Sequence, residues 1–234
     1  MADGSVGFAA RNAGAGPRLR TGIVVNLPAA GIWSGGLGNR PVVRRLRERS
    51  ANPRCRCCRR VFPVHADARA LPFGVDFFDA IICIDSIIYY GTDDLYLNYL
   101  ARFVRPEGKV GIAGAGLVQE IHGPIPEHLR RWWTNDLWCL HSAAWWRRHW
   151  ERTGIMAIEV ADTLADGWRL WLDWHKVIAP DNEPEITALE ADRGAYLGYV
   201  RLVGRRQGQA QLADHIVSIP AQYVRKPLLR AEES

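Results

Sequence analysis

Two acidic residues that each close an apolar segment are the first sign of chemistry in this chain. Asp67 comes directly after the apolar residues 61–66, and Asp85 ends a second apolar run that begins near Phe77. A Leu-Pro-Phe turn at 71–73 separates the two runs. In an open α/β sheet the carboxyl ends of parallel strands line the ligand crevice, whereas the apolar runs behind them supply the core. The sequence therefore predicts two adjacent strands whose ends present carboxylates to a site.

The residues that follow continue in an order typical of an α/β protein. A helix is predicted over 93–104, because its apolar residues recur at spacings of three and four and mark one buried face. Pro106 lies in the turn 105–108 that ends this helix, and a strand is predicted over 109–115. Further along, a helix over 142–153 with Ser142 as its cap and a strand over 155–161 are expected.

This ordered set resembles the second half of a class I S-adenosylmethionine-dependent methyltransferase. More narrowly, it is similar to the bacterial small-molecule enzymes grouped with the ubiquinone and cyclopropane-fatty-acid methyltransferases. The resemblance covers about 61–206 and is carried by Asp67-Ala68, Leu71-Pro72-Phe73, Phe78-Asp79-Ala80-Ile81, Leu100 and Val104-Arg105-Pro106-Glu107-Gly108-Lys109. It implies an α/β fold, with a Rossmann-like, mostly parallel sheet, flanking helices and a helical insertion before the last strand. It also implies S-adenosyl-L-methionine as cofactor and a small-molecule acceptor.

The resemblance also suggests which residues hold the methyl donor. Asp67 and Ala68 match the position that binds adenine, where the carboxylate accepts from the exocyclic amine and the neighbouring amide meets a ring nitrogen. A cap on the following turn is the alternative for Asp67. Asp85 and Ser86 match the position near the methionine part of the donor or near the acceptor, and a structural Asx or Ser turn is the alternative there.

Candidates for the acceptor side come from the aromatic and titratable residues of the second half. Nine of the ten tryptophans lie between Trp132 and Trp174, which suggests an aromatic-walled pocket for a planar, apolar or cationic acceptor. The substrate candidates are Tyr90, Trp145 and Trp146, and core packing is the alternative for each. The candidates for a general base are Glu120, His122 and His141, each of which could instead be a hydrogen-bonded structural residue. No metal site is predicted, because a zinc module at Cys55, Cys57 and Cys58 would lack a second ligand pair.

The expected domain organisation places the insertion late in the chain. We expect a disordered arm over 1–20, a methyltransferase-like domain over 21–226 and a tail over 227–234. Within the domain, 21–60 is a divergent or degraded donor-loop region, and 163–210 is a helical insertion or cap. The insertion is expected to contain helices over 166–178 and 183–206, before a last strand over 215–224. Such an insertion is a candidate lid over the substrate.

The first 60 residues depart from the methyltransferase pattern. Only Gly36-Leu37-Gly38 approaches the glycine spacing that lets a backbone come close to the donor. The same segment holds twelve arginines, no lysine and only Asp3 and Glu48, whereas the whole chain has a net charge of +5. Three explanations are open: a degraded donor site, a divergent loop in a working enzyme, or translation of this region in a shifted reading frame. The alternative function is an inactive methyltransferase-like domain that binds nucleic acid or another anionic partner through its arginines, although nucleic acid is disfavoured as a partner.

Composition sets the remaining expectations. With 234 residues and 48% apolar content, the chain can build a full core. No apolar run approaches the ~18 residues of a membrane span, so we expect a cytoplasmic protein without membrane contact. Five cysteines, three of them crowded together, argue against a disulfide framework. The sequence does not indicate an oligomeric state.

Overall fold

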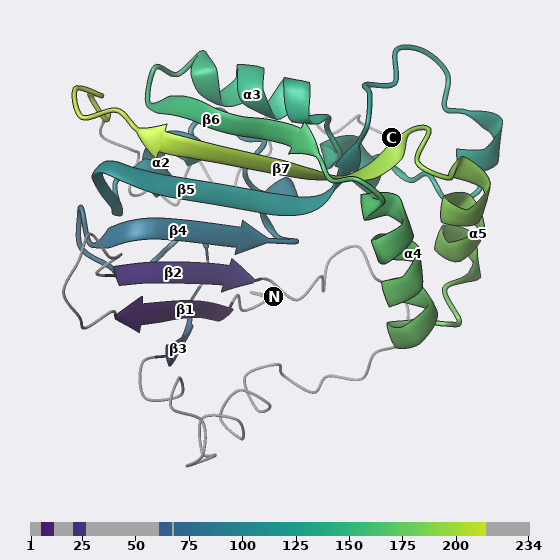
Figure 1. Cartoon of the computed structure of the whole chain (residues 1–234), viewed down its shortest axis with the longest axis horizontal. Helices are drawn as coiled ribbons and strands as arrows, with labels where there is room; N and C mark the ends of the chain where they lie inside the picture. The colour runs from purple at the N-terminus through teal and green to yellow at the C-terminus, as the bar shows by residue number, and fades with distance from the viewer. Residues whose placement is uncertain (1–5, 12–20, 27–60, 67, 214–234) are drawn as a thin grey trace, which may run out of the picture.

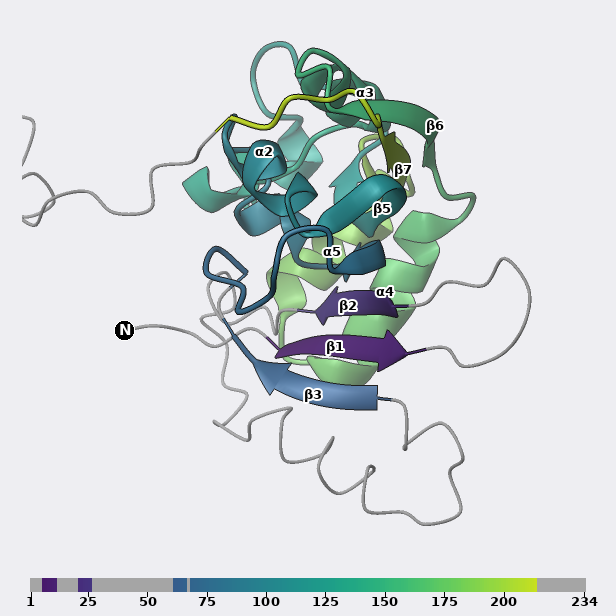
Figure 2. The same ribbon diagram turned by 90° about the vertical axis from the view of Figure 1, so that its left-hand side faces the viewer.

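One mixed sheet of seven strands forms the centre of the molecule. The computed structural model describes residues 6–11, 21–26, 61–66 and 68–213. The strands lie in the order β3-β1-β2-β4-β5-β7-β6 (Figure 1), and Figure 2 shows β3, β1 and β2 side by side at one edge. Their bounds are β1 (Val6–Arg11), β2 (Thr21–Asn26), β3 (Val61–His65), β4 (Phe78–Ile84), β5 (Val104–Leu117), β6 (Met156–Thr163) and β7 (Leu197–Arg206).

The direction of the strands confirms the predicted α/β architecture. β2 pairs in parallel with β4, and β4 with β5. β1 runs antiparallel to β2 and β3, and β7 runs antiparallel to β5 and β6. Five of the seven strands therefore point the same way, although four of the six neighbouring pairs are antiparallel. The carboxyl ends of β2, β4, β5 and β6 meet at one edge of the sheet.

Helices cover one face of the sheet and this carboxyl edge. α2 packs on β5, and α3 packs on β6 and β7. Figure 1 shows α4 and α5 at the end of the sheet to which the arrowheads of β2, β4 and β6 point. The helical segments are η2 (Ile87–Tyr89), α2 (Tyr96–Ala101), η3 (Glu127–Leu129), η4 (Asn135–Cys139), α3 (Ala143–Glu151), α4 (Gly167–Ile178) and α5 (Glu183–Asp192).

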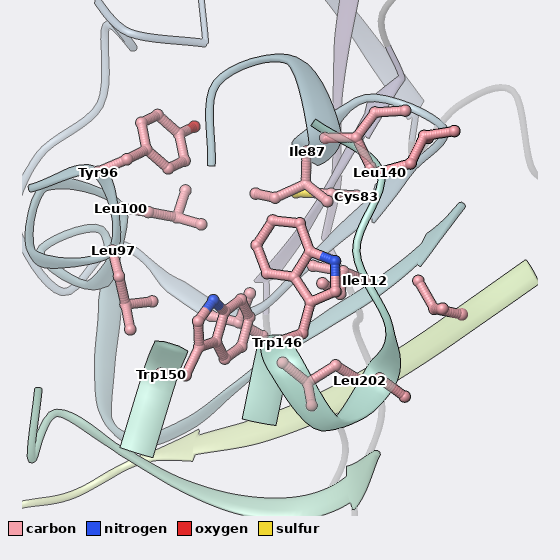
Figure 3. Close-up of a cluster of buried hydrophobic side chains, with 14 of the residues drawn as sticks. Cys83, Ile87, Tyr96, Leu97, Leu100, Ile112, Leu140, Trp146, Trp150 and Leu202 are labelled. Carbon is pink, nitrogen blue, oxygen red and sulfur yellow. The ribbon is translucent and has the colours of Figure 1, made fainter. Parts of the chain in front are cut away.

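A single hydrophobic core joins α2 and α3 to the central strands. Trp146 and Trp150, one turn apart on α3, are 0% and 1% exposed. Figure 3 shows the Trp146 ring beside Ile87 and Ile112, with Leu97 near Trp150. Burial of aromatic side chains of this size strongly stabilises the folded state. The core includes buried residues of β4 and β5 close to their carboxyl ends, so these strand ends are held by packing.

Two expectations from the sequence about these elements were wrong. Residues 6–11, assigned to a disordered arm, form β1. The helix expected over 183–206 ends at Asp192, where Arg193 and Gly194 adopt φ angles of 50° and 82°. The Asp192 carboxylate accepts hydrogen bonds from the amides of Tyr196 and Leu197, so the chain reverses and continues as β7. The strand predicted over 215–224 lies outside the described residues.

The boundaries of two further elements also moved. α2 covers only Tyr96–Ala101, because the Asp93 carboxylate accepts from the Leu95 amide and holds a turn before the helix. The turn predicted over 105–108 is instead part of β5, which begins at Val104 and not at residue 109. By contrast, α3 begins as predicted, with the Ser142 hydroxyl accepting from the Trp145 amide at 3.2 Å.

Candidate active site at the carboxyl edge

Asp85 stands at the end of β4 in a backbone conformation that side chains seldom adopt. Its φ angle is 50°, and its amide donates to the Ala113 carbonyl of β5 at 2.9 Å. Burial raises the pKa of Asp85, although hydrogen bonds from the Tyr199 hydroxyl and the Ala115 amide act in the opposite direction. Left-handed conformations in non-glycine residues persist where the surroundings enforce them and are common at ligand sites. The structure thus fixes a partly desolvated carboxyl group at the edge of the sheet.

Ser86 follows Asp85 and is almost completely buried. It precedes η2, and its hydroxyl oxygen accepts from the Tyr90 hydroxyl at 3.1 Å. The Tyr90 ring lies 4.7 Å from the ring of Tyr96, and burial strongly raises the pKa of Tyr90. Tyr90 is therefore held in place by Ser86 and Tyr96, and its suggested role as a substrate contact stays a prediction.

The loop after β3 is fastened to α2. Asp67 lies outside the described residues, whereas Ala68 is buried and its carbonyl accepts from the Tyr96 hydroxyl at 3.1 Å. Three residues on, the Leu71 amide donates to the Tyr99 hydroxyl at 2.6 Å. Two tyrosines of one helix therefore hold the segment that the methyltransferase resemblance assigns to adenine.

Glu120 and His141, which are 21 positions apart in the sequence, meet beside the end of β5. The Glu120 Oε2 lies 3.2 Å from the His141 Nδ1, and Oε1 accepts from both the amide and the hydroxyl of Ser142 at 2.7 Å. Partial burial acts to raise the pKa of Glu120, but the hydrogen bonds from Ser142 and His141 outweigh it and lower that pKa. Gly116 permits this approach, because a Cβ there would lie 2.7 Å from the His141 carbonyl oxygen. An ionised Glu120 can only accept a hydrogen bond from Nδ1–H of His141, which leaves the lone pair of His141 on Nε2.

An aromatic stack continues from His141 along α3. The Trp145 ring lies 3.7 Å from the His141 ring and 4.5 Å from the His149 ring, with interplanar angles of 5° and 19°. The His149 Nε2 lies 3.1 Å from the Gly91 carbonyl oxygen, so this nitrogen carries the proton. Burial and the Arg152 guanidinium lower the pKa of His149, against the Gly91 carbonyl. These surroundings favour the neutral form of His149, and the stack restricts the orientation of the His141 ring.

A second buried carboxyl group, Glu185, holds the inserted helices together. Its Oε1 accepts from the Trp171 Nε1 at 2.9 Å and its Oε2 from the Asn182 Nδ2 at 2.8 Å. The His175 Nε2 lies 3.3 Å from Oε1. Burial raises the pKa of Glu185 to about 7 and lowers that of His175 to about 4. This pair connects α4 to α5 in an environment that disfavours both charges.

Comparison with known proteins places this architecture among solved structures. No family model and no curated protein matches the sequence. Phosphoethanolamine N-methyltransferase 2 from Haemonchus contortus, solved with phosphomonomethylethanolamine and S-adenosylhomocysteine, matches with a TM-score of 0.50 and 16% identity over 70% of this chain and 40% of that one. Geranyl diphosphate C-methyltransferase from Streptomyces coelicolor matches with a TM-score of 0.46 and 14% identity over 60% of this chain and 50% of that one.

This chain has a methyltransferase fold. The likeness to the enzyme from Haemonchus contortus carries that statement, and at this identity it concerns the fold alone. The chain spans less than half the length of that enzyme. In the part of the methyltransferase fold that the structure describes, no helix combines the length and the apolar character needed to cross a bilayer. No group of three potential metal ligands converges within the same residues.

The structure distinguishes between candidate site residues that were equivalent in the sequence. The side chain of Trp146 is fully enclosed in the core, which favours core packing, the alternative given for it, over contact with a substrate. His122 is exposed, and no hydrogen bond between described residues joins it to Glu120 or His141. The cysteines at 55–58 and the arginine-rich segment lie outside the described residues.

Two contributors to the site and one buried carboxyl group of the inserted helices were missed. Tyr199 was assigned to a helix, so its approach to Asp85 could not be foreseen. Ser142 was assigned only as a helix cap. It directly follows His141, and both residues contact Glu120. Glu185 carried no local pattern that distinguished it from an exposed helical glutamate.

Proposed function

We propose that this chain binds S-adenosylmethionine at the carboxyl edge of its sheet and transfers the methyl group to a small-molecule acceptor. The fold supports the proposal, since the structure from Haemonchus contortus that shares it was solved with S-adenosylhomocysteine. A fold hosts many activities, so the weight falls on the site itself. The observation that carries the proposal is the Glu120–His141 pair beside the strand ends that present Asp85 and Ser86.

The residues at this edge fit the donor. Burial raises the pKa of Asp85, and among the described residues no lysine or arginine forms an ion pair with its carboxylate. The α-ammonium group of the donor would supply a positive charge to this carboxylate. We assign Asp85 and Ser86 to the methionine part of the donor, and the backbone of Ala68 together with Asp67 to the adenine.

Proton removal from the acceptor is the task that the chain's own residues would perform. When bound, S-adenosylmethionine supplies a methyl group already activated on a sulfonium. Glu120 holds Nδ1 of His141 protonated, and the stack on Trp145 fixes the ring plane. Nε2 of His141 would then take the proton that the acceptor loses as its lone pair bonds to the methyl carbon. Holding the reactants in line supplies much of the remaining acceleration.

Turnover measurements on matched variants test this assignment. Release of S-adenosylhomocysteine is followed with a panel of amines, phenols and carboxylates as acceptors, and the best acceptor is kept. His141→Gln should lower kcat by about 100-fold, the lower end of general-base effects, with an unchanged affinity for S-adenosylhomocysteine. Glu120→Gln should lower kcat less, because it perturbs only the orientation and tautomer of His141.

His122→Gln is the matched control, since its imidazole is exposed and outside the pair. It should turn over like the unmodified protein. If His141→Gln and His122→Gln have equal kcat, His141 is not the base.

A further inference from the structure

We propose that Tyr96 and Tyr99 are positioning residues of the donor site, and that Tyr90 links them to Ser86 at the end of β4. The inference rests on the proposed function, because it assigns a role to side chains that do not themselves contact the donor. It adds a set of hydroxyl groups that shape the binding loop before the ligand arrives.

The hydroxyls of Tyr96 and Tyr99 form hydrogen bonds with the loop after β3 at two separate residues. The Tyr96 hydroxyl donates to the Ala68 carbonyl at 3.1 Å, and the Tyr99 hydroxyl accepts from the Leu71 amide at 2.6 Å. Residues 68–71 contain neither a strand nor a helix, so side-chain contacts of this kind decide their shape. With both ends held, the peptide groups between Ala68 and Leu71 keep one orientation.

The spacing of the two tyrosines on α2 allows both hydrogen bonds to form. Tyr96 and Tyr99 lie three residues apart and therefore on one face of the helix, with ring centroids 5.7 Å apart. Tyr96 is buried and Tyr99 half-buried, and Tyr99 packs edge-on against Phe103 at 5.1 Å. Both rings pack in the core, so the positions of their hydroxyls are fixed.

Tyr90 extends the restraint to the neighbouring strand. Its ring lies 4.7 Å from Tyr96, and its hydroxyl donates to the Ser86 hydroxyl oxygen at 3.1 Å. The three tyrosines thus span the distance from the loop after β3 to the end of β4. These are the two segments that the proposed function gives to opposite ends of one donor molecule.

Preorganisation predicts a specific consequence for binding. If the loop is fixed in advance, the ligand does not have to order it, and affinity is higher by the ordering cost that is avoided. One neutral hydrogen bond contributes about 0.5–1.5 kcal/mol, so loss of either hydroxyl should weaken donor binding by about 2- to 12-fold. The effect should appear in the dissociation constant and in KM for S-adenosylmethionine, with kcat at saturating donor unchanged.

The test compares Tyr96→Phe and Tyr99→Phe in the full chain by calorimetric titration with S-adenosylhomocysteine. Both changes keep the ring and its packing. Thr153→Val is the matched control, because the Thr153 hydroxyl also joins two backbone groups, the Trp150 carbonyl and the Ile155 amide, in the turn between α3 and β6. Hydrogen exchange at the Leu71 amide should be faster in Tyr99→Phe. It measures the Tyr99–Leu71 hydrogen bond in the absence of ligand.

The outcomes separate the inference from the function on which it rests. Weaker binding in both tyrosine variants, with Thr153→Val binding like the unmodified protein, supports the positioning role. Unchanged binding in both variants, or an equal loss in Thr153→Val, overturns it and leaves the methyl-transfer proposal standing. If the unmodified protein does not bind S-adenosylhomocysteine, the proposed function fails and the positioning role fails with it.

Discussion

Replacement of Glu185 by glutamine should remove a specific part of the pH dependence of folding. Glu185 is 6% exposed and its pKa is raised to about 7 from an ordinary value of 4.5. A raised carboxyl pKa means that the folded state binds the proton more tightly than the unfolded state. Its contribution to stability is therefore present at low pH and is lost as the pH rises from 4.5 through 7.

The magnitude follows from the two pKa values. The full loss is about 3 kcal/mol, since one pKa unit corresponds to about 1.4 kcal/mol, and about 1.4 kcal/mol of it falls between pH 6 and pH 8.5. His175, with its pKa lowered to about 4, has the opposite sign, because its neutral form is favoured and stability is lost as the pH falls below 6.5. Comparing two proteins that both retain His175 cancels most of that contribution.

Urea unfolding at several pH values between 6 and 8.5, followed by tryptophan fluorescence, measures the difference. The unmodified protein should lose about 1.4 kcal/mol more than Glu185→Gln over this range. Glutamine loses one acceptor for Asn182 or Trp171, so the variant has a constant offset that does not change with pH. Glu190→Gln on the exposed side of α5 is the control and should keep the original slope. Equal slopes in the unmodified protein and Glu185→Gln would refute the assignment of the raised pKa.

Three further substitutions separate packing from binding. Trp146→Ala should lower the free energy of unfolding by about 3–5 kcal/mol in urea titrations, whereas a small loss would return Trp146 to the substrate candidates. Ser142→Ala should cost about 1 kcal/mol through loss of the cap on α3 and should raise the pKa of Glu120, which is measurable by carboxyl NMR; an unchanged pKa would contradict the Ser142 contact. Asp67→Ala should weaken S-adenosylhomocysteine binding more than folding, and equal losses would make Asp67 structural.

Elements with a local pattern were predictable from the sequence. The apolar run before Asp85 gave β4, and the Ser142 cap followed by helical spacing gave α3. Each rests on interactions among residues within a few positions of one another. β7 was missed because its strand pairing joins residues far apart in the sequence, with β5 and β6 as partners. The reversal before it is local, but no residue pattern marks the hydrogen bonds from the Tyr196 and Leu197 amides to the Asp192 carboxylate.

The candidate site depended on contacts between distant residues. His122 and His141 were equivalent in the sequence, and only the fold brings one of them to Glu120. Trp145 and Trp146 are neighbours, yet the orientation of α3 leaves one half-exposed and encloses the other. Tertiary packing decides which of two such residues is buried or reaches Glu120, and no fixed residue spacing in the sequence indicates the result.

Calorimetric titration of the full chain with S-adenosylhomocysteine is the most direct test of the central claim. The account predicts saturable binding of one ligand per chain at the carboxyl edge, with slower hydrogen exchange at residues 68–71 and 85–86 when the ligand is present. A chain that is folded by circular dichroism but shows neither heat of binding nor protection at these residues would contradict it.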